Sequence, residues 1–135
     1  MARSVIADAG FLVALLARRD SHHAWATAQA RRYIPPWHSC EAALSEAFHL
    51  LGPRGLSALT QLLRRRAVLI GFAVDQHLES VLALMQKYAN VPMSLADACL
   101  VRMTETRADP VLLTTDTDFR NYRRHGRQVV PCIMP

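Results

Sequence analysis

The chain has 135 residues, of which 51% are hydrophobic, and its formal net charge is +5 with an isoelectric point near 9.7. This size and hydrophobic content predict one compact domain over residues 1–135. Charged residues interrupt every apolar stretch before it reaches the roughly eighteen residues that a membrane-spanning helix needs. We therefore expect that the chain does not span a membrane.

The first twenty residues and the cysteines both predict a cytoplasmic protein. The apolar residues 9–17 follow an acid and precede Arg18-Arg19-Asp20, which does not resemble the small-residue cleavage site of a signal peptide. The three cysteines are far apart and lack C-x-x-C spacing, so neither a disulfide framework nor a zinc site is expected. A reducing compartment is the simplest setting for them.

The basic residues are almost all arginines. Lysine and arginine total 16 against 11 acids, and Lys87 is the only lysine. Guanidinium groups form bidentate contacts with phosphate, so this composition suits binding to a nucleic acid or another polyanion. A modest positive charge also serves solubility, and charge alone therefore leaves both explanations open.

The first half of the chain is predicted to alternate between strands and helices. In chain order, we expect a strand at 4–7, helices at 11–17 and 22–32, a strand at 37–39 and a helix at 40–51. Pro35-Pro36 ends any regular structure after the second helix. Gly52-Pro53 ends the third, because glycine is common just after a helix and proline soon beyond it.

The second half continues the alternation and indicates the fold class. We expect a helix at 55–66, a strand at 68–72, helices at 75–88 and 94–106, and strands at 111–115 and 128–134. Asp75 and Ser94 are the predicted caps of the last two helices, and Pro92 separates them. Strands that alternate with helices predict an α/β fold of three layers, with a central, mainly parallel sheet and helices on both sides.

Acidic residues follow two of the predicted strands. Asp8 comes directly after the strand at 4–7, and Asp116 and Asp118 follow the strand at 111–115. In open α/β folds, ligands bind at the carboxyl ends of the parallel strands. Asp97 lies in the first turn of the helix at 94–106. Grouped carboxylates need a cation, and hard oxygen ligands suit Mg²⁺ or Mn²⁺, so the pattern predicts a divalent-metal site for phosphodiester chemistry.

Each of these acids also has a structural explanation. Asp8 and Asp116 stand where aspartate commonly makes turns or caps helices. Asp97 lies three residues after Ser94, the spacing of a capping box, in which the acid reaches back to the amide of the capping residue. The residues alone leave the metal site and the turn or cap roles open.

The helix at 40–51 contains two glutamates, both at the edges of its apolar face. Glu41 lies in the first turn, where the helix dipole favours an acid. Glu46 lies in the middle of the helix and has no capping role, which slightly favours it as a site residue. Periodicity alone does not choose firmly between them.

Four short segments follow one another along the chain. They are IADAGFLVALL at 6–16, LSEAFHLL at 44–51, PMSLADA at 92–98 and LTTDTDF at 113–119. Together they resemble the PIN-domain ribonucleases, and specifically the small bacterial VapC-type toxins of type II toxin–antitoxin systems. The resemblance covers nearly the whole chain and implies a PIN-like fold.

The resemblance also implies roles for individual residues. It assigns catalytic, metal-binding roles to Asp8, Glu46, Asp97 and Asp116, with Asp118 as an auxiliary metal ligand. Two positions depart from the family pattern. Gly10 stands where many relatives have serine or threonine, and Ser94 stands where many have an acid. A hydroxyl near the metal and one outer carboxylate are therefore missing at these positions, but all core acids remain.

The activity that the resemblance implies is cleavage of RNA phosphodiester bonds by a metal-dependent endoribonuclease, with Mg²⁺ or Mn²⁺ as cofactor. The implied partners are RNA, a cognate antitoxin protein and a second copy of the chain, which would pair through helices 55–66 and 75–88. The alternative is a catalytically silent PIN-like module that binds RNA or protein. Retention of the four core acids favours the enzyme, and only an activity assay separates the two.

Overall fold

A computed structural model of the protein describes residues 3–135; residues 1 and 2 of the predicted domain lie outside this range. Within it, five parallel strands form a central sheet in the order β3-β2-β1-β4-β7. The strands are β1 (Ser4–Ala7), β2 (Trp37–Ser39), β3 (Val68–Ile70), β4 (Pro110–Leu113) and β7 (Cys132–Ile133). Residues 4–7 of β1 pair one by one with residues 110–113 of β4, so these two central strands end side by side.

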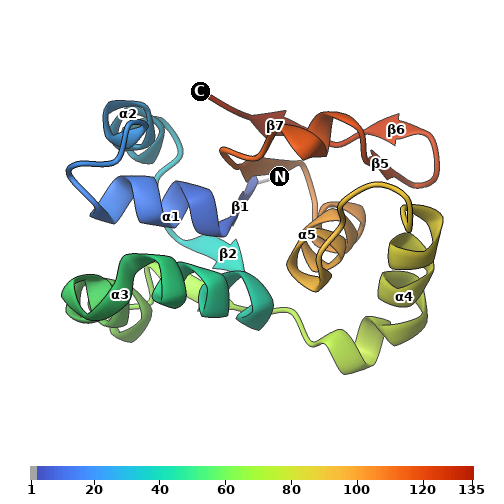
Figure 1. Ribbon diagram of the computed structural model, residues 1–135, viewed down its shortest axis with the longest axis horizontal. Coiled ribbons are helices and arrows are strands. Elements are labelled where there is room, and N and C mark those ends of the chain that lie inside the picture. The colour runs from blue at the N-terminus through green and yellow to red at the C-terminus, as the bar shows by residue number, and fades with distance from the viewer. Residues whose placement is uncertain (1–2) are drawn as a thin grey trace.

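Helices cover both faces of this sheet, as the sequence predicts. Figure 1 shows α1, α2 and α3 on one side of the strands and α4 and α5 on the other. The helices are α1 (Ala9–Leu16), α2 (His23–Arg32), α3 (Glu41–Arg64), α4 (Leu78–Lys87) and α5 (Leu95–Thr106). The predicted three-layer α/β fold is confirmed. No helix within residues 3–135 has both the length and the apolar character needed to cross a lipid bilayer.

Two hydrophobic clusters hold the three layers together. Successive strand residues point to opposite faces of a sheet. Val5 and Ala7 accordingly pack with Phe11 of α1 in the first cluster, while Ile6 between them packs with Leu100 of α5 in the second. All five side chains are buried. The continuous apolar runs of β1 and β4 thus reflect strands that are covered on both faces.

The order of the strands fixes where a ligand can bind. The chain leaves β1 and adds β2 and β3 on one side, and then returns to place β4 on the other side of β1. The connections therefore diverge between β1 and β4, which opens a crevice beyond the carboxyl ends of these strands. Both strands are followed by acidic residues, so the topology brings these acids to one edge of the sheet.

The boundary predicted at Gly52-Pro53 is the point where two helical segments meet at a kink. The helices expected at 40–51 and 55–66 join end to end as α3, which bends at Gly52. Gly52 has a φ of 65° and a ψ of −167°, a conformation that is essentially restricted to glycine. Pro53 lacks an N–H, so it suits the first position of the second half of the helix.

The strand expected at 128–134 is two strands in different sheets. Gln128–Val129 forms β6, which pairs antiparallel with β5 (Arg123–Arg124), whereas β7 joins the central sheet beside β4. Pro131 lies between them and has no N–H for a strand ladder.

The helix expected at 75–88 also begins later than predicted. A 3₁₀ turn, η1 (Val74–His77), contains Asp75, so this residue does not cap α4. On α4, Val81 is buried, but Leu78 and Leu82 are 43% and 42% exposed. Much of the apolar surface of this helix therefore faces outward.

Candidate functional site

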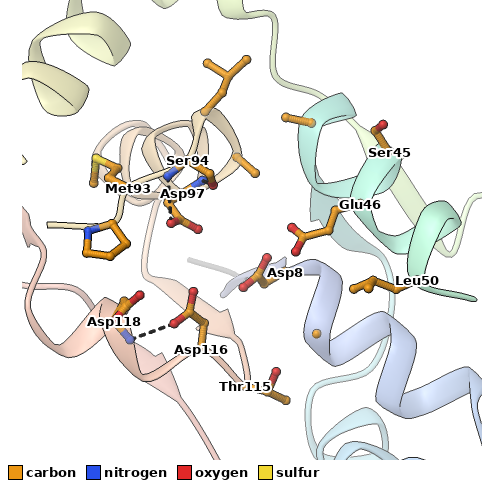
Figure 2. Close-up of a pocket in the computed structure, with 15 residues that line it drawn as sticks. Asp8, Ser45, Glu46, Leu50, Met93, Ser94, Asp97, Thr115, Asp116 and Asp118 are labelled. Carbon is orange, nitrogen blue, oxygen red and sulfur yellow. Dashed lines mark hydrogen bonds between the residues drawn. The ribbon is translucent and has the colours of Figure 1, made fainter. Parts of the chain in front are cut away.

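A cleft of about 830 Å³ lies beyond the carboxyl ends of β1 and β4. All the acids that the sequence analysis singled out as metal ligands line it, and they come from separate parts of the chain. Figure 2 shows one from the end of β1, one from α3, one from the start of α5 and two from the segment after β4. They are Asp8, Glu46, Asp97, Asp116 and Asp118.

Asp8 is the most buried acid of the cleft and is 6% exposed. It caps α1, because its Oδ1 accepts a hydrogen bond from the backbone N–H of Ala9 at 2.7 Å. Its Oδ2 accepts a hydrogen bond from the hydroxyl of Thr114, also at 2.7 Å. Burial, together with the charges of Asp97 and Glu46, raises the pKa of Asp8 to about 7, although these two hydrogen bonds act to lower it.

Thr114 connects the ends of the two central strands. Its buried hydroxyl donates to Asp8 and accepts a hydrogen bond from the backbone N–H of Asp116 at 3.0 Å. One side chain therefore fixes the position of one acid and the backbone of another. From the sequence, Thr114 reads equally well as a β-branched residue of a buried strand, so only its place directly after β4 signals this role.

Asp97 caps α5 and also lines the cleft. Ser94 and Asp97 form a complete capping box at the start of α5, with the Asp97 Oδ2 accepting the Ser94 N–H at 3.1 Å. The Tyr122 hydroxyl donates to the backbone carbonyl of Pro92 and lies 3.2 Å from the same Asp97 oxygen, in hydrogen-bond range of both. Asp97 nevertheless lines the cleft, and its Oδ1 has no hydrogen-bond donor among the described residues. Burial raises the pKa of Asp97, and the charge of Asp116 adds to this effect.

Asp116 and Asp118 share one short turn. Asp116 caps the 3₁₀ turn η2 (Thr117–Arg120), and its Oδ1 accepts a hydrogen bond from the Asp118 N–H at 2.9 Å. The dashed line in Figure 2 marks this bond. Thr117 lies between them, is exposed and does not line the cleft.

The two glutamates of α3 have different surroundings. Glu46 lines the cleft, and in Figure 2 its carboxylate points toward Asp8. Glu41 lies in the first turn of α3, is exposed and is not among the residues that line the cleft. This position suits the dipole role that the sequence analysis gave to Glu41.

The comparison with family models agrees with this fold and cleft. The model of the PIN domain matches residues 5–125, which is most of the chain. The chain belongs to the PIN domain family. Proteins of this family are typically nucleases, and PIN nucleases act on RNA. No curated protein matches this PIN domain closely enough to narrow the assignment.

The donor set of the PIN-domain cleft suits Mg²⁺ or Mn²⁺ in one particular way. Within residues 3–135, no three acidic, histidine or cysteine side chains converge closely enough to enclose an ion. Mg²⁺ does not require such an enclosure, because it keeps several waters and binds proteins through one or two carboxylates together with substrate phosphates. An open cleft whose polar side chains are carboxylates and hydroxyls fits this mode.

Proposed function

We propose that this PIN-domain protein is a metal-dependent endoribonuclease. The observation that carries the proposal is that five carboxylates, from four segments of the chain, line one open cleft. So many acids in one place repel one another unless a cation is bound. The energetic cost of this arrangement is best explained by a cation site, with Asp8, Glu46, Asp97 and Asp116 as ligands and Asp118 as an auxiliary ligand.

A bound Mg²⁺ or Mn²⁺ would lower the pKa of a coordinated water and stabilise the charge that develops on the phosphate. The protein's part is to hold the acids in place before substrate arrives. The Thr114 hydroxyl and the Ala9 amide fix Asp8, and Ser94 and Tyr122 fix Asp97. Acids that are held by such contacts need little rearrangement when the phosphate binds.

The charge distribution suits an RNA substrate. Five of the eleven acids line the cleft, which leaves six to balance sixteen basic residues elsewhere. A second cavity of about 250 Å³ lies where α1 ends beside the kink of α3, and Arg18, Arg19 and Arg54 line it. Both cavities are lined by α1 and α3. A strand of RNA whose scissile phosphate lies in the acidic cleft would find guanidinium groups for neighbouring phosphates there.

We further propose that the protein is the toxin of a VapC-type toxin–antitoxin pair. The support is the resemblance of the four acid-bearing segments to that group. A toxin must be silenced in its host, and a partner peptide with an arginine that reaches the carboxylates of the cleft would do so. Expression alone should then slow bacterial growth, and co-expression of the small gene beside it should restore growth.

Metal dependence tests the proposed activity. The purified protein should cleave single-stranded RNA in Mg²⁺ or Mn²⁺, stop when a chelator is added and recover when the metal is restored. Cleavage that is unaffected by a chelator would contradict the proposed cation site. If the protein binds RNA but does not cleave it with either metal, the silent binding module becomes the better description.

A further inference from the structure

The Thr115 side chain lies where a side chain on residue 10 would be, at the edge of the cleft. Gly10 is the second residue of α1. A Cβ atom on residue 10 would lie 2.1 Å from Thr115 Oγ1 and 3.2 Å from Thr115 Cβ. The absent side chain of Gly10 therefore leaves the space in which the Thr115 hydroxyl lies.

This hydroxyl belongs to the cleft. Gly10 and Thr115 both line it, and Figure 2 shows Thr115 beside the start of α1, close to Asp116. The figure draws no hydrogen bond from Thr115 to any other residue that lines the cleft. The neighbouring hydroxyl of Thr114, by contrast, is committed to Asp8 and to the backbone of Asp116.

A free hydroxyl has a specific use in such a cleft. Ionised carboxylates only accept hydrogen bonds and repel a phosphate, whereas a hydroxyl can donate to a phosphate oxygen. We propose that the Thr115 hydroxyl, held over Gly10, donates a hydrogen bond to a phosphate oxygen of the RNA in the cleft. The proposal rests on the proposed function, because that function puts a phosphate there. It makes Thr115 a substrate-binding residue and gives a reason for glycine at position 10.

Two substitutions separate this contact from simple packing. Thr115→Val keeps nearly the same shape and removes the hydroxyl, while Thr115→Ser keeps the hydroxyl. Affinity is measured by fluorescence anisotropy of a labelled single-stranded RNA in Ca²⁺, a cation that also takes oxygen ligands. Hydrogen bonds to charged groups are strong, so we expect Thr115→Val to weaken RNA binding about tenfold or more and Thr115→Ser to bind like the wild type.

The hydroxyl can also be moved to the other residue. In the double variant Gly10→Ser/Thr115→Gly, the hydroxyl comes from α1 and the clash with Thr115 is removed. We expect this variant to recover most of the RNA affinity that Thr115→Val loses. Gly10→Ala adds a Cβ and forces the Thr115 hydroxyl away, so it should weaken RNA binding. Thr117→Val, on the exposed residue nearby, is the matched control and should bind normally.

Measurements of Mn²⁺ affinity and of RNA cleavage show whether the Thr115 contact or the nuclease function is wrong. Calorimetric titration of Mn²⁺ into the RNA-free protein should give the same affinity for wild type and Thr115→Val, because the proposed partner is the phosphate. A loss of Mn²⁺ affinity, or unchanged RNA binding in Thr115→Val, would overturn the proposal. If the wild type binds RNA through Thr115 but never cleaves it, the nuclease function fails while the phosphate contact stands. If it neither binds nor cleaves RNA, both fail.

Discussion

At the scale of single residues, the acids of the cleft serve structure and site together. Asp8 caps α1 and Asp97 completes a capping box, and both line the cleft. The sequence presented these roles as alternatives, because spacing along the chain does not reveal which acids meet in space. A cap needs only one carboxylate oxygen, so a second function of the same side chain is physically compatible.

The pKa of Asp8 predicts how the stability of the metal-free protein depends on pH. The folded protein holds the proton up to about pH 7, whereas the unfolded chain releases it near the ordinary aspartate pKa of 3.8. The unfolded state then binds fewer protons between these values, so stability falls as pH rises through this window and levels off above it. The full effect is roughly 4 kcal/mol at most.

Thermal unfolding in the presence of a chelator measures this effect. The wild type should melt at a higher temperature at pH 5 than at pH 8, and Asp8→Asn should show a clearly smaller difference. Because the pKa of Asp97 is also raised, part of the pH dependence of the melting temperature should remain in Asp8→Asn. An equal difference in melting temperature between pH 5 and pH 8 for the two proteins would contradict the buried, protonated state of Asp8.

The two glutamates of α3 give a matched pair of substitutions. Both are exposed and lie on one helix, but only Glu46 lines the cleft. Glu46→Gln should reduce Mg²⁺-dependent RNA cleavage by roughly tenfold or more, because a metal ligand loses its charge. Glu41→Gln should cleave at the wild-type rate. The reverse result, with Glu41→Gln inactive and Glu46→Gln active, would mean that the wrong glutamate is assigned to the site.

At the scale of elements, local signals predicted the strands and helices near the cleft well. The strands at 4–7 and 37–39 match β1 and β2, and Ser94 caps α5 as expected. These elements combine apolar runs with clear caps. The sequence predicted the end of the first helical segment of α3 at Gly52-Pro53, but not that the second segment follows at once across a kink. At 128–134, the apolar run concealed the interruption at Pro131.

The kink in α3 predicts a specific sensitivity at Gly52. Gly52→Ala forces a residue with a Cβ into a backbone conformation that is essentially limited to glycine, although the side chain itself would meet no atom within 4 Å. We expect it to lower the free energy of unfolding by about 1–3 kcal/mol, measured by urea denaturation. Gly71→Ala is the control, because its nearest neighbour is 3.9 Å away and its φ is not positive. Equal stability of the two variants would argue against the kink.

At the scale of the whole molecule, the fold leaves apolar surface on two helices. Leu78 and Leu82 on α4 and Leu56 on α3 are each more than two fifths exposed. The resemblance to the VapC-type proteins implies dimerisation through this part of the chain. A symmetric dimer would bury these side chains. The sequence predicted the helices but not which of their leucines face outward, because that depends on how α4 packs against α5.

Self-association is therefore expected through α4 and the second half of α3. Light scattering at tens of micromolar should give about twice the mass of 15.1 kDa calculated for one chain. Leu78→Glu/Leu82→Glu should give the monomer mass, because charged groups resist burial in an apolar interface. A strict monomer for the wild type at this concentration would contradict the prediction.

The central claim is that the acids of the cleft hold the cation that cleaves RNA, and Asp8 tests it most directly. Asp8→Asn keeps the size of the side chain and removes the charge. The measurement is the rate of RNA cleavage in Mg²⁺ by this variant and by the wild type, with circular dichroism to verify that both are folded. We predict that the rate falls at least about 100-fold in a folded protein. Cleavage by Asp8→Asn at the wild-type rate would contradict the account.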